Sequence, residues 1–206
     1  QNGEQITSEV TFVPEAPSGS VEVLFTFDAK LIKADTNIVV FESLYSDSKE
    51  LTVHADIEDE AQTVTVIVPE IKTEASTDGK KETTIGGEIT IEDIVSYHNL
   101  TPGKEYVVKG TLMNKTTGKP VTVNDEPVTA EAAFTPETRD GEVKATFTFN
   151  SYVITETTDV VVFESLYREE IEIAVHADIE DEGQSVTVYV PEIKTTASID
   201  GKKEIT

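Results

Sequence analysis

Four polar side chains stand where the surrounding sequence is apolar or where alternation assigns them to a buried strand face. They are Thr73, Glu164, His176 and Gln184. A hydroxyl is a weak nucleophile until a base removes its proton, and an imidazole is a suitable base near neutral pH. A carboxamide is a poor electrophile, so attack on it requires a donor for the developing oxyanion and an acid for the departing nitrogen. These residue types include the groups that such a reaction needs.

Each of these residues also has an ordinary structural interpretation. A Thr on a strand is usually a β-former, a His beside apolar residues is usually a hydrogen-bonded core residue, and a Gln that opens a strand usually caps an edge. The acidic run at 178–182 is first interpreted as a solvated loop, with calcium binding as the alternative because carboxylate oxygens are the ligands of that ion. Recurrence within the chain favours the chemical interpretation.

The sequence contains a long internal repeat. Residues 41–57, FESLYSDSKELTVHADI, return at 163–179 as FESLYREEIEIAVHADI, an offset of 122 residues. A unit of this length is too long for a solenoid repeat and suits an independently folding domain, so tandem duplication is the interpretation. The residues that the same offset relates to the candidate set are Glu42, His54, Gln62 and Thr195.

The elements that must position these side chains are predicted to be strands. Period-two alternation or β-rich composition marks 21–27, 38–41, 63–68, 88–91, 106–112, 143–149, 160–163 and 184–190. Turn signals separate these runs at 77–79, 101–103, 117–120 and 139–141. A short helical turn is also expected near residues 91–97. The predicted fold is all-β, with tandem immunoglobulin-like β-sandwich domains.

Domain junctions are expected where Val-Pro-Glu-Ile-Lys-Thr occurs, because Pro cannot donate to a sheet ladder and marks a strand end. The motif stands at 68–73 and again at 190–195. We therefore interpret residues 1–68 as the C-terminal part of one repeat domain and 69–190 as a complete domain. Residues 191–206 would be the first strand of a following repeat.

Composition excludes several functions. The chain has 16 Lys and Arg against 40 Asp and Glu, a net charge of -24, so phosphate backbones and anionic membranes would repel it. No apolar run is long enough to insert in a membrane, and the first residues do not resemble a signal peptide. Without Cys there is no disulfide, thiolate zinc site or catalytic thiol, and no metal or cofactor is expected.

A family resemblance rests on several spaced motifs. Val-Val-Phe-Glu-Ser at 161–165, His176 with its acidic loop and Gln184, and Ile-Lys-Thr with a nearby Asp-Gly resemble the Thr–Gln ester-bond domains, or VaFE repeats, of Gram-positive surface adhesins. The resemblance implies that a Thr hydroxyl and a Gln carboxamide react spontaneously to form an ester and release ammonia. It assigns the cross-link to Thr73 and Gln184 and the helper roles to Asp93, Glu164 and His176.

The resemblance also implies a biological role. The chain would be a stalk or spacer of an extracellular, cell-wall-anchored adhesin, in which cross-linking is a single-turnover self-modification and not enzyme catalysis. Its partners would be neighbouring repeats of the same polypeptide, and a tip domain outside this chain would bind the host ligand. In the incomplete units, Glu42, His54, Gln62 and Thr195 match parts of the motif, and a bond between Gln62 and Thr195 of the same or another chain is an open alternative.

Three other functions remain in view. A β-sandwich that binds host protein or carbohydrate would be expected to expose more aromatic residues than this chain, with 7% aromatics and no Trp, contains. A pilin-like domain with a Lys isopeptide bond would survive hydroxylamine, which cleaves an ester. A hydrolase that uses Thr, His and Asp would need a glycine-rich oxyanion loop or nucleophile elbow, which the sequence lacks.

Overall fold

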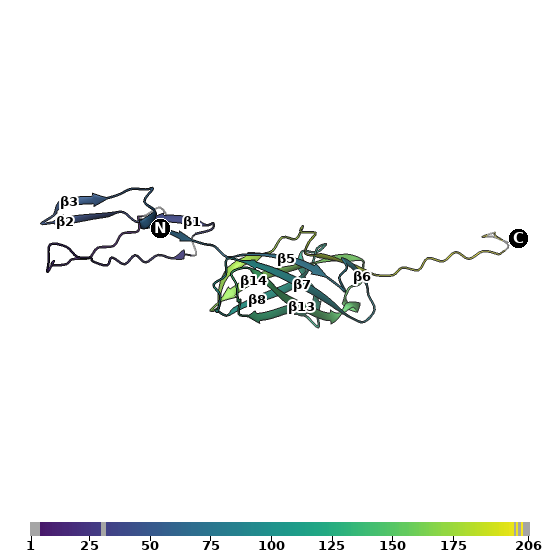
Figure 1. The fold of residues 1–206 in the computed structure, drawn as a ribbon. Coiled ribbons are helices and arrows are strands. Elements are labelled where there is room, and N and C mark those ends of the chain that lie inside the picture. The colour runs from purple at the N-terminus through teal and green to yellow at the C-terminus, as the bar shows by residue number, and fades with distance from the viewer. Residues whose placement is uncertain (1–4, 30–31, 200, 202, 204–206) are drawn as a thin grey trace. The chain divides into compact units, whose positions relative to one another are not determined.

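The computed structural model describes residues 5–29, 32–199, 201 and 203, and the regular elements in this part of the chain are strands and single-turn 3₁₀ helices. The all-β class is confirmed. The chain divides into two compact units, one that ends at Val68 and one that begins at Pro69 (Figure 1). No helix in the described residues is long and apolar enough to cross a bilayer.

The first unit is built from two short antiparallel ladders. Strand β1 (Thr36–Val39) pairs with β4 (Thr63–Val66), and β2 (Glu42–Ser46) pairs with β3 (Lys49–His54). A 3₁₀ turn, η2 (Glu60–Gln62), precedes β4. Every residue of β2 and β3 is exposed. The strand predicted at 21–27 is wrong, since these residues form no ladder and a strand needs a partner for its backbone groups.

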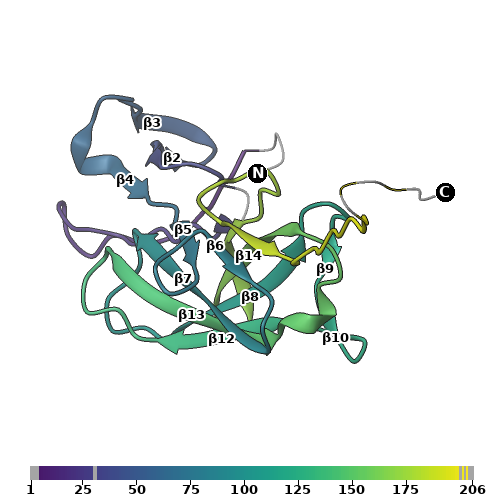
Figure 2. The same cartoon turned by 90° about the vertical axis from the view of Figure 1, so that its right-hand side faces the viewer.

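The smaller sheet of the second unit has three strands. It contains β5 (Glu70–Ser76), β7 (Glu88–His98) and β13 (Gly141–Asn150) in the order β13-β7-β5, all antiparallel (Figure 2). The helical turn expected near 91–97 is wrong, because these residues lie in the central strand and pair on both sides. Their side chains alternate between buried and half-buried, as a strand with one face in the core requires.

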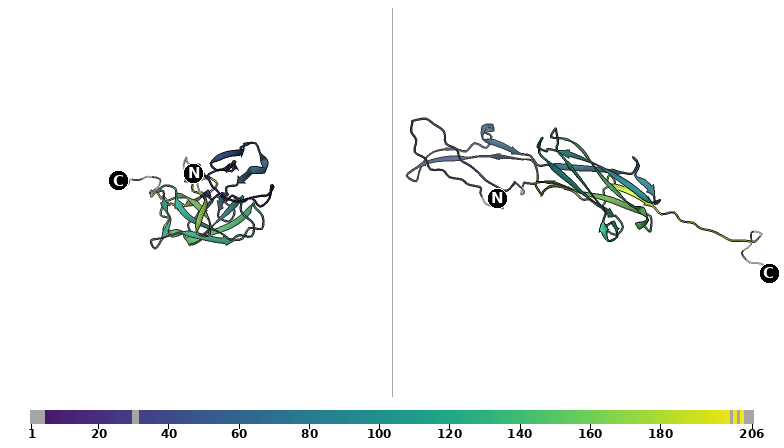
Figure 3. Two further views of the ribbon diagram at one scale, coloured as in Figure 1. Left: turned by 90° about the vertical axis from the view of Figure 1, so that its left-hand side faces the viewer. Right: turned by 90° about the horizontal axis from the view of Figure 1, so that it is seen from below.

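The larger sheet has seven strands. Its main order is β12-β8-β14-β16-β6, with β15 beside β14 and β9 beside β8. The bounds are β6 (Glu82–Thr84), β8 (Tyr106–Asn114), β9 (Lys119–Pro120), β12 (Thr129–Phe134), β14 (Thr158–Arg168), β15 (Ile171–His176) and β16 (Ser185–Tyr189). All pairs are antiparallel except β16 with β6. A small hairpin joins β10 (Thr122–Val123) to β11 (Glu126–Pro127), and η3 (Ser151–Val153) precedes β14. Figure 3 shows these strands from two further sides.

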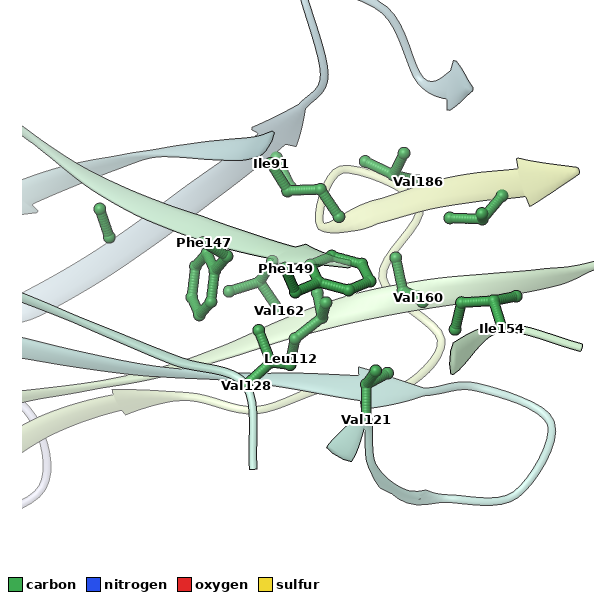
Figure 4. Packing of buried hydrophobic residues seen from close by; sticks show 13 residues of the cluster. Ile91, Leu112, Val121, Val128, Phe147, Phe149, Ile154, Val160, Val162 and Val186 are labelled. Atoms are coloured by element: carbon green, nitrogen blue, oxygen red, sulfur yellow. The ribbon is translucent and has the colours of Figure 1, made fainter. Parts of the chain in front are cut away.

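The two sheets of the second unit pack face to face around buried apolar side chains. In Figure 4, Phe147 and Phe149 of β13 point toward Leu112 of β8 and Val162 of β14. Burial of such side chains is the main favourable contribution to folding. A second cluster contains buried residues of both sheets and the loop residue Leu100; the sheet residues are Ile71, Val95, Tyr97, Tyr106, Val108 and Leu166. This unit is therefore a two-layered β-sandwich.

One glycine allows the sheets to approach closely near the candidate residues. Gly110 of β8 pairs with Glu164 of β14, and a Cβ atom at Gly110 would lie 2.5 Å from the Phe147 ring of the opposite sheet. A Cβ atom this close to a ring carbon would overlap with it sterically, so a larger residue at 110 would require the ring to move. The absence of a side chain at Gly110 therefore lets the Phe147 ring fill the space beside the strand that carries Glu164.

Candidate functional site

The structure brings five predicted residues together between the two sheets of the second unit. Thr73 on β5 and Asp93 on β7 come from the smaller sheet, while Glu164 on β14, His176 on β15 and Gln184 before β16 come from the larger sheet. Glu164 and His176 are directly paired across β14 and β15. The site is therefore assembled from both layers of the sandwich.

Alternation explains why Asp93 points into the sandwich. It lies on the central strand β7, midway between the buried residues Ile91 and Val95 on the same face. Its neighbours across the two ladders are Ala75 on β5 and Ala145 on β13, both essentially fully buried. Two small side chains leave room for a carboxyl group, where larger apolar residues would fill the space.

The central contact joins a hydroxyl to a carboxamide. Gln184 Nε2 donates hydrogen bonds to Thr73 Oγ1 and to Glu164 Oε2, the latter at 2.9 Å. Gln184 is 0% exposed and lies 111 residues after Thr73 in the sequence. The nucleophile and the acyl group suggested by the sequence are thus in direct contact, with Gln184 fully buried and Thr73 half-buried.

Two buried acids stand beside this contact. Asp93 is 0% exposed and Glu164 is 1% exposed, and burial raises the pKa of both carboxyl groups. The hydrogen bond to Asp93 and the negative charge of Asp93 raise the Glu164 pKa further, to about 10. At Asp93, the hydrogen bond to Glu164 and the charges of His176 and Lys81 oppose the rise in pKa.

The hydrogen-bonding needs of the two acids point to a shared proton. If both groups were ionised, three buried oxygens would lack a hydrogen-bond donor. These are both carboxyl oxygens of Asp93 and Oε1 of Glu164. Two carboxylates can only accept, so a hydrogen bond between them requires a proton on one of them. One proton held between Asp93 and Glu164 satisfies this requirement and agrees with the raised pKa of both groups.

His176 is held by an acid that the sequence analysis missed. His176 Nε2 lies 2.9 Å from Asp181 Oδ2, and Asp181 Oδ1 accepts a 2.7 Å hydrogen bond from the Gly183 amide. Although burial opposes ionisation, the hydrogen bonds from Gly183 and His176 lower the pKa of Asp181. An Asp five residues after the His also occurs at His54 and Asp59, and this recurrence was the available signal.

Lys81 is a second residue that sequence reasoning missed. Its Nζ donates to the backbone oxygens of Ala75 and Gly183, both at 2.6 Å. Its partners are backbone groups brought together only by folding, so neither alternation nor spacing identifies them. The recurrence of Asp-Gly-Lys-Lys-Glu at 78–82 and 200–204 was the only signal in the sequence.

The first unit contains part of the same arrangement. Gln62 Nε2 donates to Glu42 Oε2, and His54 Nε2 lies 2.9 Å from Asp59 Oδ2. Gln62 Oε1 is buried without a partner among the described residues. Thr195 is exposed in a segment, 191–198, that forms no strand, and no described hydrogen bond involves it. Residues 200, 202 and 204–206 of the strand expected at 191–206 lie outside the described residues.

The acidic groups of the second unit also bear on the question of a metal site. Within the described ranges, no cluster of three or more His, Asp or Glu side chains is placed to hold a metal ion. The acidic run at 178–182 instead provides internal hydrogen bonds, since Asp178 accepts from the Glu180 amide and Asp181 from His176 and Gly183.

Comparison with known proteins gives a family and a structural likeness. A family model described as T-Q ester bond containing domain matches residues 1–66 and 69–188. No curated protein matches the chain. A solved bacterial adhesin from Mobiluncus mulieris, described as containing intramolecular disulfide, isopeptide and ester bond cross-links, aligns with a TM-score of 0.50 and 19% identity over 60% of this chain. The match spans 58% of the adhesin chain, less than two thirds of its length.

A second crystal form of the same adhesin gives a TM-score of 0.47 and 19% identity, covering 58% of this chain and 56% of the adhesin chain. At this level of identity, the likeness to the first crystal form establishes a similar fold and nothing about individual residues.

Proposed function

Because the chain belongs to the family of T-Q ester bond containing domains, we propose that its second unit forms an ester between Thr73 Oγ1 and the side-chain carbonyl carbon of Gln184. The observation that carries this proposal is the contact between the Thr73 hydroxyl and the Gln184 carboxamide. That contact lies beside two buried acids whose pKa values are raised. A nucleophile, an acyl group and a proton reservoir therefore meet in one site between the two sheets.

The first step is addition of the hydroxyl to the carboxamide. Thr73 Oγ1 bonds to the Gln184 carbonyl carbon, and the hydroxyl proton passes to the acid pair, which then holds two protons. The hydroxyl proton enters the pair through Glu164, which hydrogen-bonds both Thr73 and Gln184, while the proton already on Glu164 moves to ionised Asp93. This contact favours the acid pair over His176 as the proton acceptor. His176, whose described hydrogen bond goes to Asp181, is the second candidate for this role.

The developing oxyanion also needs a donor. Gln184 Oε1 is buried without a partner, whereas Nε2 faces Glu164. The oxygen and nitrogen of a carboxamide are nearly the same size, so the amide group fits equally well when rotated by 180°. In the rotated orientation, the carbonyl oxygen faces Glu164. A protonated Glu164 then donates to that oxygen and stabilises negative charge where it develops.

The second step breaks the carbon–nitrogen bond. The acid pair gives one proton to the departing nitrogen, which leaves as ammonia, and the ester carbonyl forms again. The pair finishes with the single proton with which it began, so atoms and charge balance. Thr73 and Gln184 are consumed, and the chain therefore undergoes one self-modification and does not turn over a substrate.

The product would stabilise the second unit against unfolding and extension. The bond joins residues 111 apart, on the first strand of the unit and immediately before β16, its last strand. By analogy with disulfides, closing a loop of about this size contributes roughly 4 to 5 kcal/mol of chain entropy. Unlike a disulfide, an ester resists reducing agents, and tension applied to the ends of the unit would load the covalent bond first.

We also propose that the chain serves as a stalk in an extracellular, cell-wall-anchored adhesin. The two successive matches of one family model, over residues 1–66 and 69–188, support an interpretation of the chain as tandem repeat domains. The similar fold of an adhesin with ester cross-links supports the same role. Neighbouring repeats would be the partners of this module, and a tip domain elsewhere would bind the ligand.

Intact mass under denaturing conditions tests the cross-link. One ester removes ammonia, so the native chain should be about 17 Da lighter than its sequence mass. Cyclisation of Gln1 removes the same mass, and the Thr73→Ala variant is therefore the control, since it retains Gln1 but has no hydroxyl. Equal mass deficits in the native chain and in Thr73→Ala would contradict the proposal.

A further inference from the structure

Lys81 connects the two segments that carry the reacting side chains. Its Nζ donates to the Ala75 oxygen, two residues after Thr73 on β5, and to the Gly183 oxygen, immediately before Gln184. Both distances are 2.6 Å, slightly shorter than the about 2.7 to 2.9 Å of charge-assisted N–H···O hydrogen bonds. A single ammonium group thus contacts the nucleophile strand and the acyl-donor segment simultaneously.

The topology of the sandwich makes this contact important. β5 belongs to the three-stranded sheet and β16 to the seven-stranded sheet, so no ladder fixes Thr73 relative to Gln184. In the described part of the chain, the Ala75 amide donates to the Gly183 oxygen at 3.0 Å and Gln184 Nε2 donates to Thr73 Oγ1. Lys81 adds a side-chain bridge between the backbones of the two segments. The Lys81 backbone oxygen accepts from Thr187 on β16, which anchors the residue to the larger sheet.

We propose that Lys81 is a positioning residue that holds the Thr73 strand against the Gln184 segment before the ester forms. The inference rests on the proposed cross-linking function and extends it to a residue that takes no part in the bond. Reacting atoms must be held within contact distance for a reaction of this kind, and small displacements reduce its rate strongly. The Lys81 side chain is 44% exposed, so its removal leaves no cavity in the core.

The positive charge of Lys81 also favours ester formation, through its effect on the acid pair. The groups that affect the pKa of Asp93 are Glu164, His176, Lys81 and Glu74, and the positive charge of Lys81 opposes the rise in that pKa. Ionised Asp93 leaves the shared proton on Glu164, which contacts Gln184. Lys81 therefore positions the reacting groups and favours the proton on the acid that contacts the carboxamide.

The rate of ester formation tests the proposal. The full chain is synthesised in a cell-free translation mixture, samples are stopped with acid and denaturant, and the fraction about 17 Da lighter is followed by intact mass. Lys81→Met should slow formation by about tenfold or more, the rate change that 1.4 kcal/mol of lost transition-state stabilisation produces. Lys81→Arg, which keeps the charge and the donors, should remain within about threefold of the native rate.

Two controls separate positioning from folding. Lys80→Met removes the same charge from the adjacent exposed residue and should form the ester at the native rate. Adding Lys81→Met to Thr73→Ala, which cannot cross-link, should lower the melting temperature by less than about 4 °C. A larger decrease would show that Lys81 acts through stability, and a native rate in Lys81→Met or failure of Lys81→Arg to restore it would also overturn the proposal.

These outcomes distinguish the Lys81 proposal from the proposed function on which it rests. If the native chain forms no ester, the cross-linking function fails. If the native chain cross-links and Lys81→Met cross-links equally fast, only the positioning role of Lys81 fails.

Discussion

The two compact units contain the same carboxamide–acid contact in different surroundings. Gln62 donates to Glu42 in the first unit, as Gln184 donates to Glu164 in the second. Glu42 is exposed, however, whereas Glu164 is 1% exposed. The Gln–Glu contact therefore forms without burial of the acid. Other parts of the second unit must supply the burial of Glu164.

The His–Asp pairs show the same difference. The side chain of His54 is 57% exposed and that of His176 is 21% exposed, although both lie 2.9 Å from their acids. Each His also pairs across a hairpin with its Glu, through β2 and β3 or through β14 and β15. Local pairing thus builds the acyl-donor half of the site in both units. In the second unit, the smaller sheet adds Thr73 and Asp93, and Glu164 and Gln184 are buried between the sheets.

The largest effect should follow from removing the nucleophile of the second unit. Thr73→Ala prevents the ester but leaves Asp93 and the acyl-donor half of the site in place. We expect the free energy of unfolding of this unit to fall by about 4 to 5 kcal/mol, because the unfolded chain regains the entropy of an open loop. Denaturant unfolding of both chains measures the difference, and equal stability would contradict the proposed mechanical role.

The equivalent glutamates should differ strongly in their effect on bond formation. Glu164→Gln removes the proton exchange that we assign to the acid pair and should slow ester formation by about 100-fold or more. Glu42→Gln, the matched change in the first unit, should leave the rate unchanged. His176→Ala should slow formation less than Glu164→Gln. Time-resolved intact mass gives all the rates, and the opposite order would identify His176 as the base.

Close packing in the second unit gives a third distinction. Gly110→Ala would place a Cβ 2.5 Å from the Phe147 ring and should destabilise the unlinked Thr73→Ala chain by about 1 to 3 kcal/mol. Gly19→Ala in the first unit, where no atom lies within 4 Å of the added Cβ, should change stability little. Chemical denaturation monitored by Tyr fluorescence checks both variants. A harmless Gly110→Ala would contradict the packing described between the sheets.

The smallest effect is the change in stability per pH unit. A carboxyl group with a raised folded-state pKa keeps its proton while the unfolded chain loses it, so folding is weakened as pH rises. Because the Glu164 pKa is raised to about 10, the unlinked Thr73→Ala chain should lose stability from about pH 5 up to about pH 10. The slope for one proton is at most about 1.4 kcal/mol per pH unit.

Replacing Glu164 with Gln in the Thr73→Ala background is the control for this pH dependence. It removes the titrating group and should flatten the slope, whereas Glu42→Gln in the same background should preserve it. Unfolding midpoints in urea at several pH values provide the measurement. A flat profile in the Thr73→Ala chain itself would show that Glu164 ionises normally.

Much of this site could be predicted from local sequence. Alternation places Thr73, Glu164 and Gln184 on inward faces, and the 122-residue recurrence indicates that their types are not accidental. The β class follows from the same period. Strand residues 91–97 were less clear, because acids interrupt the apolar pattern there, and only pairing with β5 and β13 makes the segment a strand.

Other features depend on contacts that form only in the folded chain. The partners of Lys81 are backbone oxygens 6 and 102 residues away, which no spacing rule identifies. Asp181 similarly acts through the Gly183 amide and His176. Residues 21–27 have suitable strand composition but no pairing partner in the structure. Contacts made in the folded chain, and not composition, decided each of these cases.

Peptide mapping tests the central claim most directly. The native chain is denatured and digested with protease, and its peptides are sequenced by mass spectrometry before and after hydroxylamine treatment. We expect a Thr73 peptide joined to a Gln184 peptide with loss of about 17 Da, separated by hydroxylamine, while the Gln62 peptide remains unlinked. Recovery of Thr73 and Gln184 in separate, unmodified peptides before hydroxylamine would contradict the cross-link.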